Sequence, residues 1–179
     1  MSRYRRAIAG STFFFTVVAY RRRPIFCDPA IRAGLHQAIR LVRASRPFVI
    51  DAWVLMPDHM HCIWALPEGD ANYSNRWFAI KRFVSSGAGQ ALHDASLLTA
   101  SRRKHRESTI WQRRFWEHQI RDEKDFERHM DYVHFNPVKH RYVGQVREWP
   151  HSTFHRYVRQ GVYPEDWGGA PGIGEMLIE

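Results

Sequence analysis

The chain has few cysteines, no long apolar stretch and fewer acidic than basic residues. Cys27 and Cys62 are its two cysteines; they lie far apart and outside any C-x-x-C pattern, which argues against a disulfide framework and a thiolate zinc site. No run approaches the roughly 18 apolar residues of a membrane-spanning helix. No G-x-x-x-x-G-K-[ST] loop is present, so nothing predicts binding of a nucleoside triphosphate.

The excess of basic residues points to a polyanionic partner. Lysine and arginine number 27 against 18 aspartate and glutamate, and the formal charge is +9 with the 11 histidines counted as neutral. Nucleic acid is the partner that such a surface attracts most readily. The basic N-terminus, residues 1–10, precedes an apolar stretch that is short and is followed by "RRR" instead of a cleavage site. We therefore expect a cytoplasmic protein.

Hydrophobic periodicity predicts four strands and three principal helices. Strands are expected over residues 11–20, 48–56, 61–67 and 110–120, where β-branched and aromatic residues are frequent. Helices are expected over 29–45, with Asp28 as the cap, over about 74–92, and from about Asp122 to Asn136, where Pro137 should end the helix. Residues 95–109 are polar and basic without a clear period, which predicts an exposed loop.

This order of elements predicts the α+β class. We expect an antiparallel sheet of four or five strands with helices packed against it, in the ferredoxin-like, RRM-like split βαβ arrangement. A length of 179 residues with 44% hydrophobic content suits one domain. We expect this single domain to span 1–179, with its core in about 11–67 and 74–140 and a tail over 141–179 that contains a short helix.

Two histidines lie one residue apart in "MPDHMHCIW", at the head of an apolar run. Because a strand has a period of two, His59 and His61 would share one face, roughly 6.5–7 Å apart at Cα, and could converge on one ion. Met60 and Cys62 would lie on the opposite, apolar face. With 11 histidines in the chain, an H-x-H pair also arises by chance, so two polar histidines at a strand end remain an alternative.

A second group of polar residues falls in "DYVHFNPVKH". On a helix, Tyr132 and Asn136 share a face, and His129 and Asp125 continue that stripe toward the N-terminus. The alternative is structural: Tyr132 would be a half-buried aromatic with its hydroxyl in water, and Asn136 would be a C-terminal cap.

Together these motifs resemble a known family. "VLMPDHMHCIWALPEG", "IWQRRFWEHQIRDEKDFERHMDYVHFNPVKHRYV" and "WPHSTFHRYVRQGVYPEDW" are similar to the REP-associated tyrosine transposases, a branch of the single-tyrosine HUH transposases of bacterial insertion sequences. The resemblance covers most of the chain. It implies that His59, His61 and Asn136 hold a divalent metal, Mg²⁺ or Mn²⁺, and that Tyr132 is the nucleophile. Relatives of this family also carry other polar residues at the position of Asn136.

The activity implied is cleavage and rejoining of single-stranded DNA at palindromic hairpin elements through a 5′-phosphotyrosine. His129, on the same helix face, is our candidate for the base that accepts the phenol proton. The partner would be hairpin DNA of the bacterial nucleoid, bound by a monomer or a homodimer. Basic residues interleaved with aromatic ones predict the DNA-binding surface; they are Arg21, Arg22, Arg23, Arg113, Arg114 and Lys139.

Two other functions remain open. An RRM-like sheet could bind single-stranded nucleic acid without cutting it, although no stacking signature of RNA-recognition domains is present on the strands. A hydrolytic metal nuclease would use water as the nucleophile, and Tyr132 would then only pack.

Overall fold

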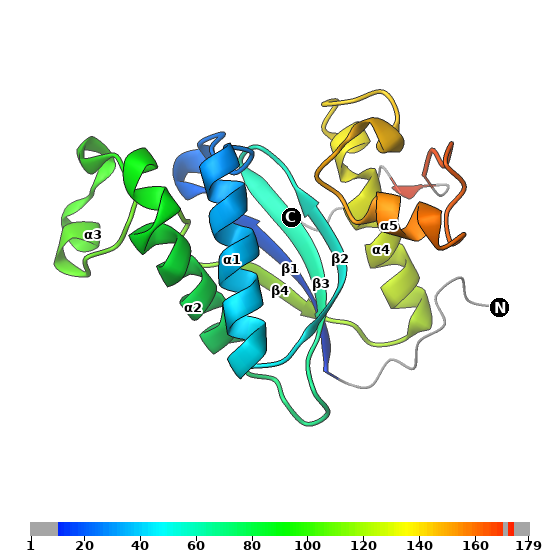
Figure 1. The fold of residues 1–179 in the computed structure, drawn as a ribbon, viewed down its shortest axis with the longest axis horizontal. Coiled ribbons are helices and arrows are strands. Elements are labelled where there is room, and N and C mark those ends of the chain that lie inside the picture. Colours follow the sequence, from blue (N-terminus) through cyan, green and yellow to red (C-terminus); the bar gives the residue numbers. More distant parts are fainter. Residues whose placement is uncertain (1–10, 170–171, 174–179) are drawn as a thin grey trace.

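The chain folds around one four-stranded antiparallel sheet with the strand order β2-β3-β1-β4 (Figure 1). The computed structural model describes residues 11–169 and 172–173. The strands are β1 (Thr12–Val18), β2 (Val49–Leu55), β3 (His59–Ala65) and β4 (Trp116–Gln119). The α-helices are α1 (Pro29–Ser45), α2 (Tyr73–Ser86), α3 (Ala100–Lys104), α4 (Glu123–Lys139) and α5 (Phe154–Arg159). The 3₁₀ turns are η1 (Tyr20–Arg22), η2 (Ala88–Leu92), η3 (Ala95–Leu97) and η4 (Val146–Glu148).

Helices cover both faces of the sheet, so the two central strands, β1 and β3, are buried almost throughout, whereas the edge strand β4 is largely exposed. Helices α1 and α2 pack on one face, and α4 with the tail around α5 packs on the other (Figure 1). The alternation along β1 shows the division, since Phe13 and Phe15 belong to the core under α1 and α2 while Phe14 belongs to the core under α4. The predicted α+β class and antiparallel sheet are confirmed.

The predicted helix start and hairpin are both present. The carboxylate of Asp28 accepts from the N–H groups of Ala30 and Ile31, and Pro29 begins α1. Strands β2 and β3 pair as an antiparallel hairpin joined at Met56–Asp58. Strand β3 begins at His59, so both histidines of the H-x-H pair lie within the strand and on one face.

Two elements differ from the sequence prediction. Helix α4 continues through Pro137 to Lys139: Asn136 and Pro137 are buried in the last turn, and their main-chain oxygens accept from the N–H groups of His140 and Tyr142. The segment 95–109 was predicted as an exposed loop; most of it is exposed, but the loop is wrong, because the segment contains η3 and α3, and Arg102 and Thr109 are buried.

The predicted helix over 74–92 and the predicted strand over 110–120 are both shorter than expected. Helix α2 ends at Ser86, next to Gly87, and η2 follows. Strand β4 spans Trp116–Gln119, and Trp111 forms a separate bridge to Ala19. The basic N-terminus, 1–10, lies outside the described residues. Within the part of the chain that is described, no helix is long and apolar enough to cross a membrane.

Candidate active site

His59 and His61 project from β3 toward α4. Their ring centroids are 4.9 Å apart and the ring planes are inclined at 75°, so in-plane lone pairs on the two rings can point at a common position. Both are fully buried, with exposures of 1% and 0%. The thiol of Cys62 belongs to the core on the opposite face of the sheet, as predicted.

Neighbouring oxygens fix the orientation of both imidazoles. Asp58 Oδ1 lies 2.7 Å from His59 Nδ1, so this nitrogen donates and Nε2 is left with its lone pair. Thr16 Oγ1 lies 2.9 Å from His61 Nδ1. Burial, reinforced by nearby His59, lowers the pKa of His61 well below its usual value, so His61 is neutral. If Nδ1 donates to Thr16, Nε2 of His61 also has a free lone pair.

Asn136 lies one turn beyond Tyr132 on α4 and contacts His59. Its Oδ1 lies 3.3 Å from His59 Nε2, which places two acceptors against each other. Among the described residues, His61 Nε2 and Asn136 Nδ2 are buried with no hydrogen-bond partner. A cation between these acceptors would satisfy them. Without a cation, flipping the side-chain amide of Asn136 by 180° would let its Nδ2 donate to His59 Nε2. The donor set of two imidazoles and an amide oxygen therefore fits a divalent metal.

Tyr132 lies beside this set. Its ring centroid is 5.2 Å from that of His61, and the ammonium of Lys139 lies 4.7 Å from the Tyr132 ring. Tyr132 is 1% exposed, so it is buried and not half-buried with its hydroxyl in water. The Tyr132 ring therefore contacts that of His61, and a phosphodiester can reach its buried hydroxyl only when covering segments move.

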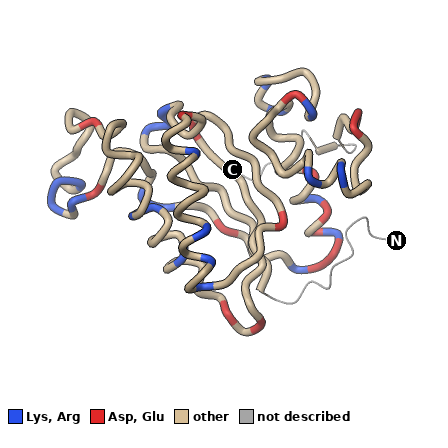
Figure 2. The backbone as a smooth tube through the Cα atoms, viewed as in Figure 1, with Lys and Arg blue, Asp and Glu red and all other residues tan. Residues whose placement is uncertain are grey.

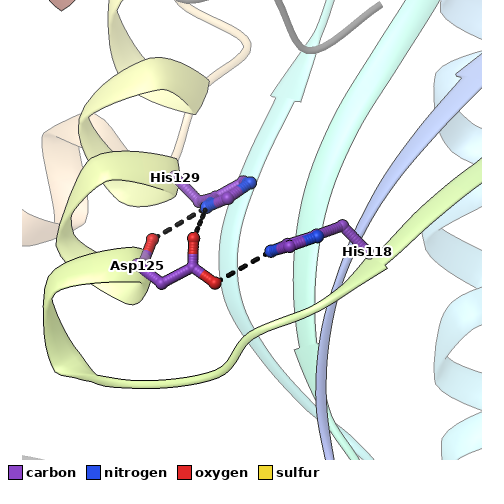
Figure 3. Close-up of side chains that lie close together, drawn as sticks. All are labelled: His118, Asp125 and His129. Carbon is purple, nitrogen blue, oxygen red and sulfur yellow. Dashed lines mark hydrogen bonds and ion pairs between the residues drawn. The ribbon is translucent and has the colours of Figure 1, made fainter.

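A second cluster joins β4 to the first turns of α4. Figure 3 shows His118 and His129 both directed at the carboxylate of Asp125, with His118 Nε2 2.8 Å from Oδ2 and His129 Nδ1 3.1 Å from Oδ1. The ligand atoms of the three residues lie within 4.8 Å of one another, close enough for one metal ion. The main-chain N–H and the guanidinium of Arg121 also donate to Oδ2.

The geometry of this cluster favours hydrogen bonding over metal binding. The His118 and His129 rings stack with planes only 13° from parallel, so their in-plane lone pairs do not converge on one ion. Burial raises the pKa of Asp125, but hydrogen bonds from Arg121 and His118 outweigh it and hold the pKa far below its usual value. Asp125 is therefore an anion that two imidazoles and a guanidinium surround.

Burial favours the neutral form of His129, and Asp125 fixes the orientation of its ring. Its Nδ1 donates to the main-chain oxygen of Asp125 at 2.7 Å, which leaves Nε2 as the acceptor. Burial lowers the pKa of His129, and Asp125 partly opposes this. The rings of His129 and Tyr132 both contact Phe14, at 4.9 and 6.0 Å between centroids.

The predicted basic residues do not form one patch. Arg22 pairs with Asp58, and Lys139 lies over Tyr132, so both contribute positive charge beside the histidines. Arg21 and Arg113 line a separate pocket of about 450 Å³, where Arg113 pairs with Glu107. Arg23 donates to the main-chain oxygen of Thr109. Arg114 is exposed.

Sequence reasoning missed four residues around the site. Asp58 directly precedes His59, which is the signal that could have identified it. Thr16 faces His61 across the β1–β3 pair, and His118 reaches Asp125 from β4. His140, whose ring centroid is 5.0 Å from that of His59, follows α4. These last three depend on strand pairing and helix packing, which sequence spacing does not reveal.

Comparisons with known proteins agree on one family. A REP-associated tyrosine transposase of Escherichia coli is 48% identical over 182 residues, and the match covers 99% of both chains. A protein of Haemophilus influenzae described as a putative REP-associated tyrosine transposase is 42% identical over 174 residues, 97% of each chain. A solved structure of a REP-associated tyrosine transposase bound to a REP hairpin matches all of both chains, with 45% identity and a TM-score of 0.71. No family model matches the chain.

Proposed function

The chain belongs to the REP-associated tyrosine transposases, and from this membership we propose that it cleaves and rejoins single-stranded DNA at palindromic hairpins, with Tyr132 as the nucleophile. The observation that supports this assignment most strongly is the position of the Tyr132 ring beside His61, whose buried Nε2 has no hydrogen-bond partner, and near the contact of His59 Nε2 with Asn136 Oδ1. The partner we propose is hairpin DNA of the kind in the related solved complex, bound by a monomer or a homodimer.

The reaction exchanges one phosphodiester for another. The oxygen of Tyr132 attacks phosphorus, the bond from phosphorus to the 3′ oxygen breaks, and the 5′ phosphate stays on the tyrosine. The phenol proton passes to a base, and the departing 3′ oxygen takes up a proton to become a hydroxyl. Attack by a 3′-hydroxyl on the phosphotyrosine reverses the step, so no nucleoside triphosphate is consumed.

We propose His59, His61 and Asn136 as the ligands of a divalent ion, Mg²⁺ or Mn²⁺. Such an ion supplies charge neutralisation at a non-bridging phosphate oxygen. Mn²⁺ accepts imidazole ligands more readily than Mg²⁺, so we expect it to support activity in vitro. Asp58 and Thr16 orient the two imidazoles through Nδ1, as partners outside the ligand set do in metal sites.

The remaining roles belong to side chains around the phenol. We propose His129 as the proton acceptor, because Asp125 keeps its Nδ1 protonated and its Nε2 free to accept. Lys139 is placed to attract the phosphate toward Tyr132. Because Tyr132 is buried, DNA binding must open the site before the phosphate meets the phenol.

One assay separates this function from a hydrolytic nuclease and from a binding module. The protein is incubated with labelled single-stranded hairpin DNA and Mn²⁺ and resolved on a denaturing gel. We expect a covalent protein–DNA band that Tyr132→Phe abolishes. Free cuts without this band would indicate a nuclease, and intact DNA would indicate a binding module; either result contradicts the proposal.

A further inference from the structure

An open groove of about 1660 Å³ runs along the outer edge of β2, between this strand and α1, where Ser152 of the tail bridges to Val54. Residues 150–153 and Arg156 of the tail close its other side. It lies apart from the His59 and His61 face, since the rings of these residues point toward α4. No role in the proposed reaction has been assigned to it.

The lining of this groove is cationic. The described residues that line it include no aspartate or glutamate, and the ionisable ones are Arg32, His36, Arg40, Arg43, His151 and Arg156. Helix α1 itself has basic residues along its length and no acidic one (Figure 2). At a rise of 1.5 Å per residue, Arg32 and Arg43 are about 16 Å apart along the helix axis, which suits an extended polyanion.

Main-chain oxygens hold these guanidinium groups in place without neutralising them. Arg32 Nε donates to Cys27 at 3.2 Å, Arg43 Nε to Phe48 at 2.9 Å, and Arg156 Nη2 to Ile50 at 3.2 Å. Elsewhere in the described chain, arginines such as Arg76 pair with a carboxylate. A carbonyl oxygen leaves the full positive charge available to a ligand, so the groove is preorganised for anions.

A line of rings connects the groove to the metal ligands. From His151 in the groove wall, centroid distances of 5.9, 5.6, 6.3 and 5.0 Å lead through Trp149, Tyr142 and His140 to His59. Tyr142 is 45% exposed. Exposed aromatic rings stack on unpaired bases, and every base offers such a face.

We propose that the groove binds the single-stranded DNA segment that flanks the cleaved phosphodiester. Arg32, Arg40 and Arg43 contact its phosphates, and the strand passes over Tyr142 toward the active site. This inference rests on the proposed function for the identity of the DNA. We propose a single strand because a base can stack on Tyr142 only when its face is not covered by a paired duplex. Such stacking does not require contacts to base edges.

The test measures binding of labelled single strands by fluorescence anisotropy. The long oligonucleotide, about 20 nucleotides, extends beyond the cleavage site, and the short one, about 8, covers only the site. The variant is Arg40→Glu with Arg43→Glu, both exposed. The control, Arg82→Glu with Lys124→Glu, makes the same charge change at exposed positions outside the groove. Arg40→Ala, a milder change on the helix surface, guards against an effect on folding.

We expect the groove variant to bind the long strand at least about tenfold more weakly than the control does, and to show a log-log salt slope smaller by about 1.4. For the short strand, the groove variant and the control should lose the same amount of affinity. Arg40→Ala should weaken binding of the long strand less than the groove variant does. Equal losses in both double variants, or a blunt duplex competing as well as the single strand, would overturn the inference. Covalent band formation by the unaltered protein is scored separately, so failure of the proposed function is distinguishable.

Discussion

Asp58 decides which nitrogen of His59 is available to a metal. Burial raises the pKa of this carboxyl, but the hydrogen bond from His59 and the nearby Arg22 outweigh it and lower the pKa overall. Asp58 is therefore ionised near neutral pH and holds the proton on His59 Nδ1. Nε2, the metal-binding atom that we propose, faces Asn136 as a consequence.

Replacing Asp58 with Asn should therefore weaken metal binding. An amide no longer requires an N–H on Nδ1, so the His59 ring loses its fixed tautomer, and we expect Mn²⁺ affinity to fall about 10- to 100-fold. Isothermal titration with Mn²⁺ measures this. Glu148→Gln, at an exposed carboxylate of η4, serves as the control, and unchanged affinity in Asp58→Asn would remove Asp58 from the metal site.

His129→Ala should slow cleavage about 100-fold while Mn²⁺ and DNA binding persist, because the variant lacks the proton acceptor. Asp125→Asn should slow cleavage less. Since Asp125 raises the pKa of His129 against the effect of burial, its loss should also move the acid limb of the pH profile to lower pH. Single-turnover rates across pH provide the readout. Rates equal to those of the unaltered protein would exclude His129 from the mechanism.

At the residue scale, the sequence carries the ligand spacing but not the surroundings. The period of a strand places His59 and His61 on one face, and the structure bears this out. The assignment of Tyr132 and Asn136 came from family resemblance, and their roles stay predictions. Thr16 meets His61 only through the register of β1 with β3, which is information that a linear pattern does not contain.

Elements with strong local signals were predictable, and elements held by distant contacts were not. The Asp28 cap and the apolar period gave the bounds of α1 correctly. In 95–109, by contrast, the turns depend on contacts such as that of Arg102, whose guanidinium lies 3.7 Å from the Tyr20 ring centroid. Such contacts leave no periodicity, so the segment was wrongly predicted to be a loop.

Helix α4 is tied to the tail through His134, which makes the tail sensitive to acid. His134 bonds to Thr153 and Tyr163, and burial lowers its pKa to about 3. The unfolded chain therefore binds a proton that the folded chain rejects between about pH 6.5 and pH 3. Stability should fall with decreasing pH in this window by about 1.4 kcal/mol per unit from this residue.

Urea unfolding at several pH values tests this dependence. Between about pH 3 and pH 6.5, His134→Gln should reduce the number of protons taken up on unfolding by about one. The same substitution at exposed His105 is the matched control. A His134→Gln variant with the full pH dependence of the unaltered protein would show that His134 is not responsible.

For the whole molecule, the net charge of +9 predicts that DNA binding is strongly salt-dependent. If about six phosphates are neutralised, the affinity for a single strand should fall with a log-log slope of roughly −4. Anisotropy titrations over a range of salt concentrations give this slope. A flat profile would contradict a binding surface built on arginine and lysine.

The central claim is that the DNA becomes attached to one of the seven tyrosines, Tyr132. Mass spectrometry of protease-digested covalent complex identifies the attachment site directly. We predict a nucleotide 5′-phosphate on the peptide that carries Tyr132 and on no other tyrosine peptide. Attachment at a different residue would contradict the account.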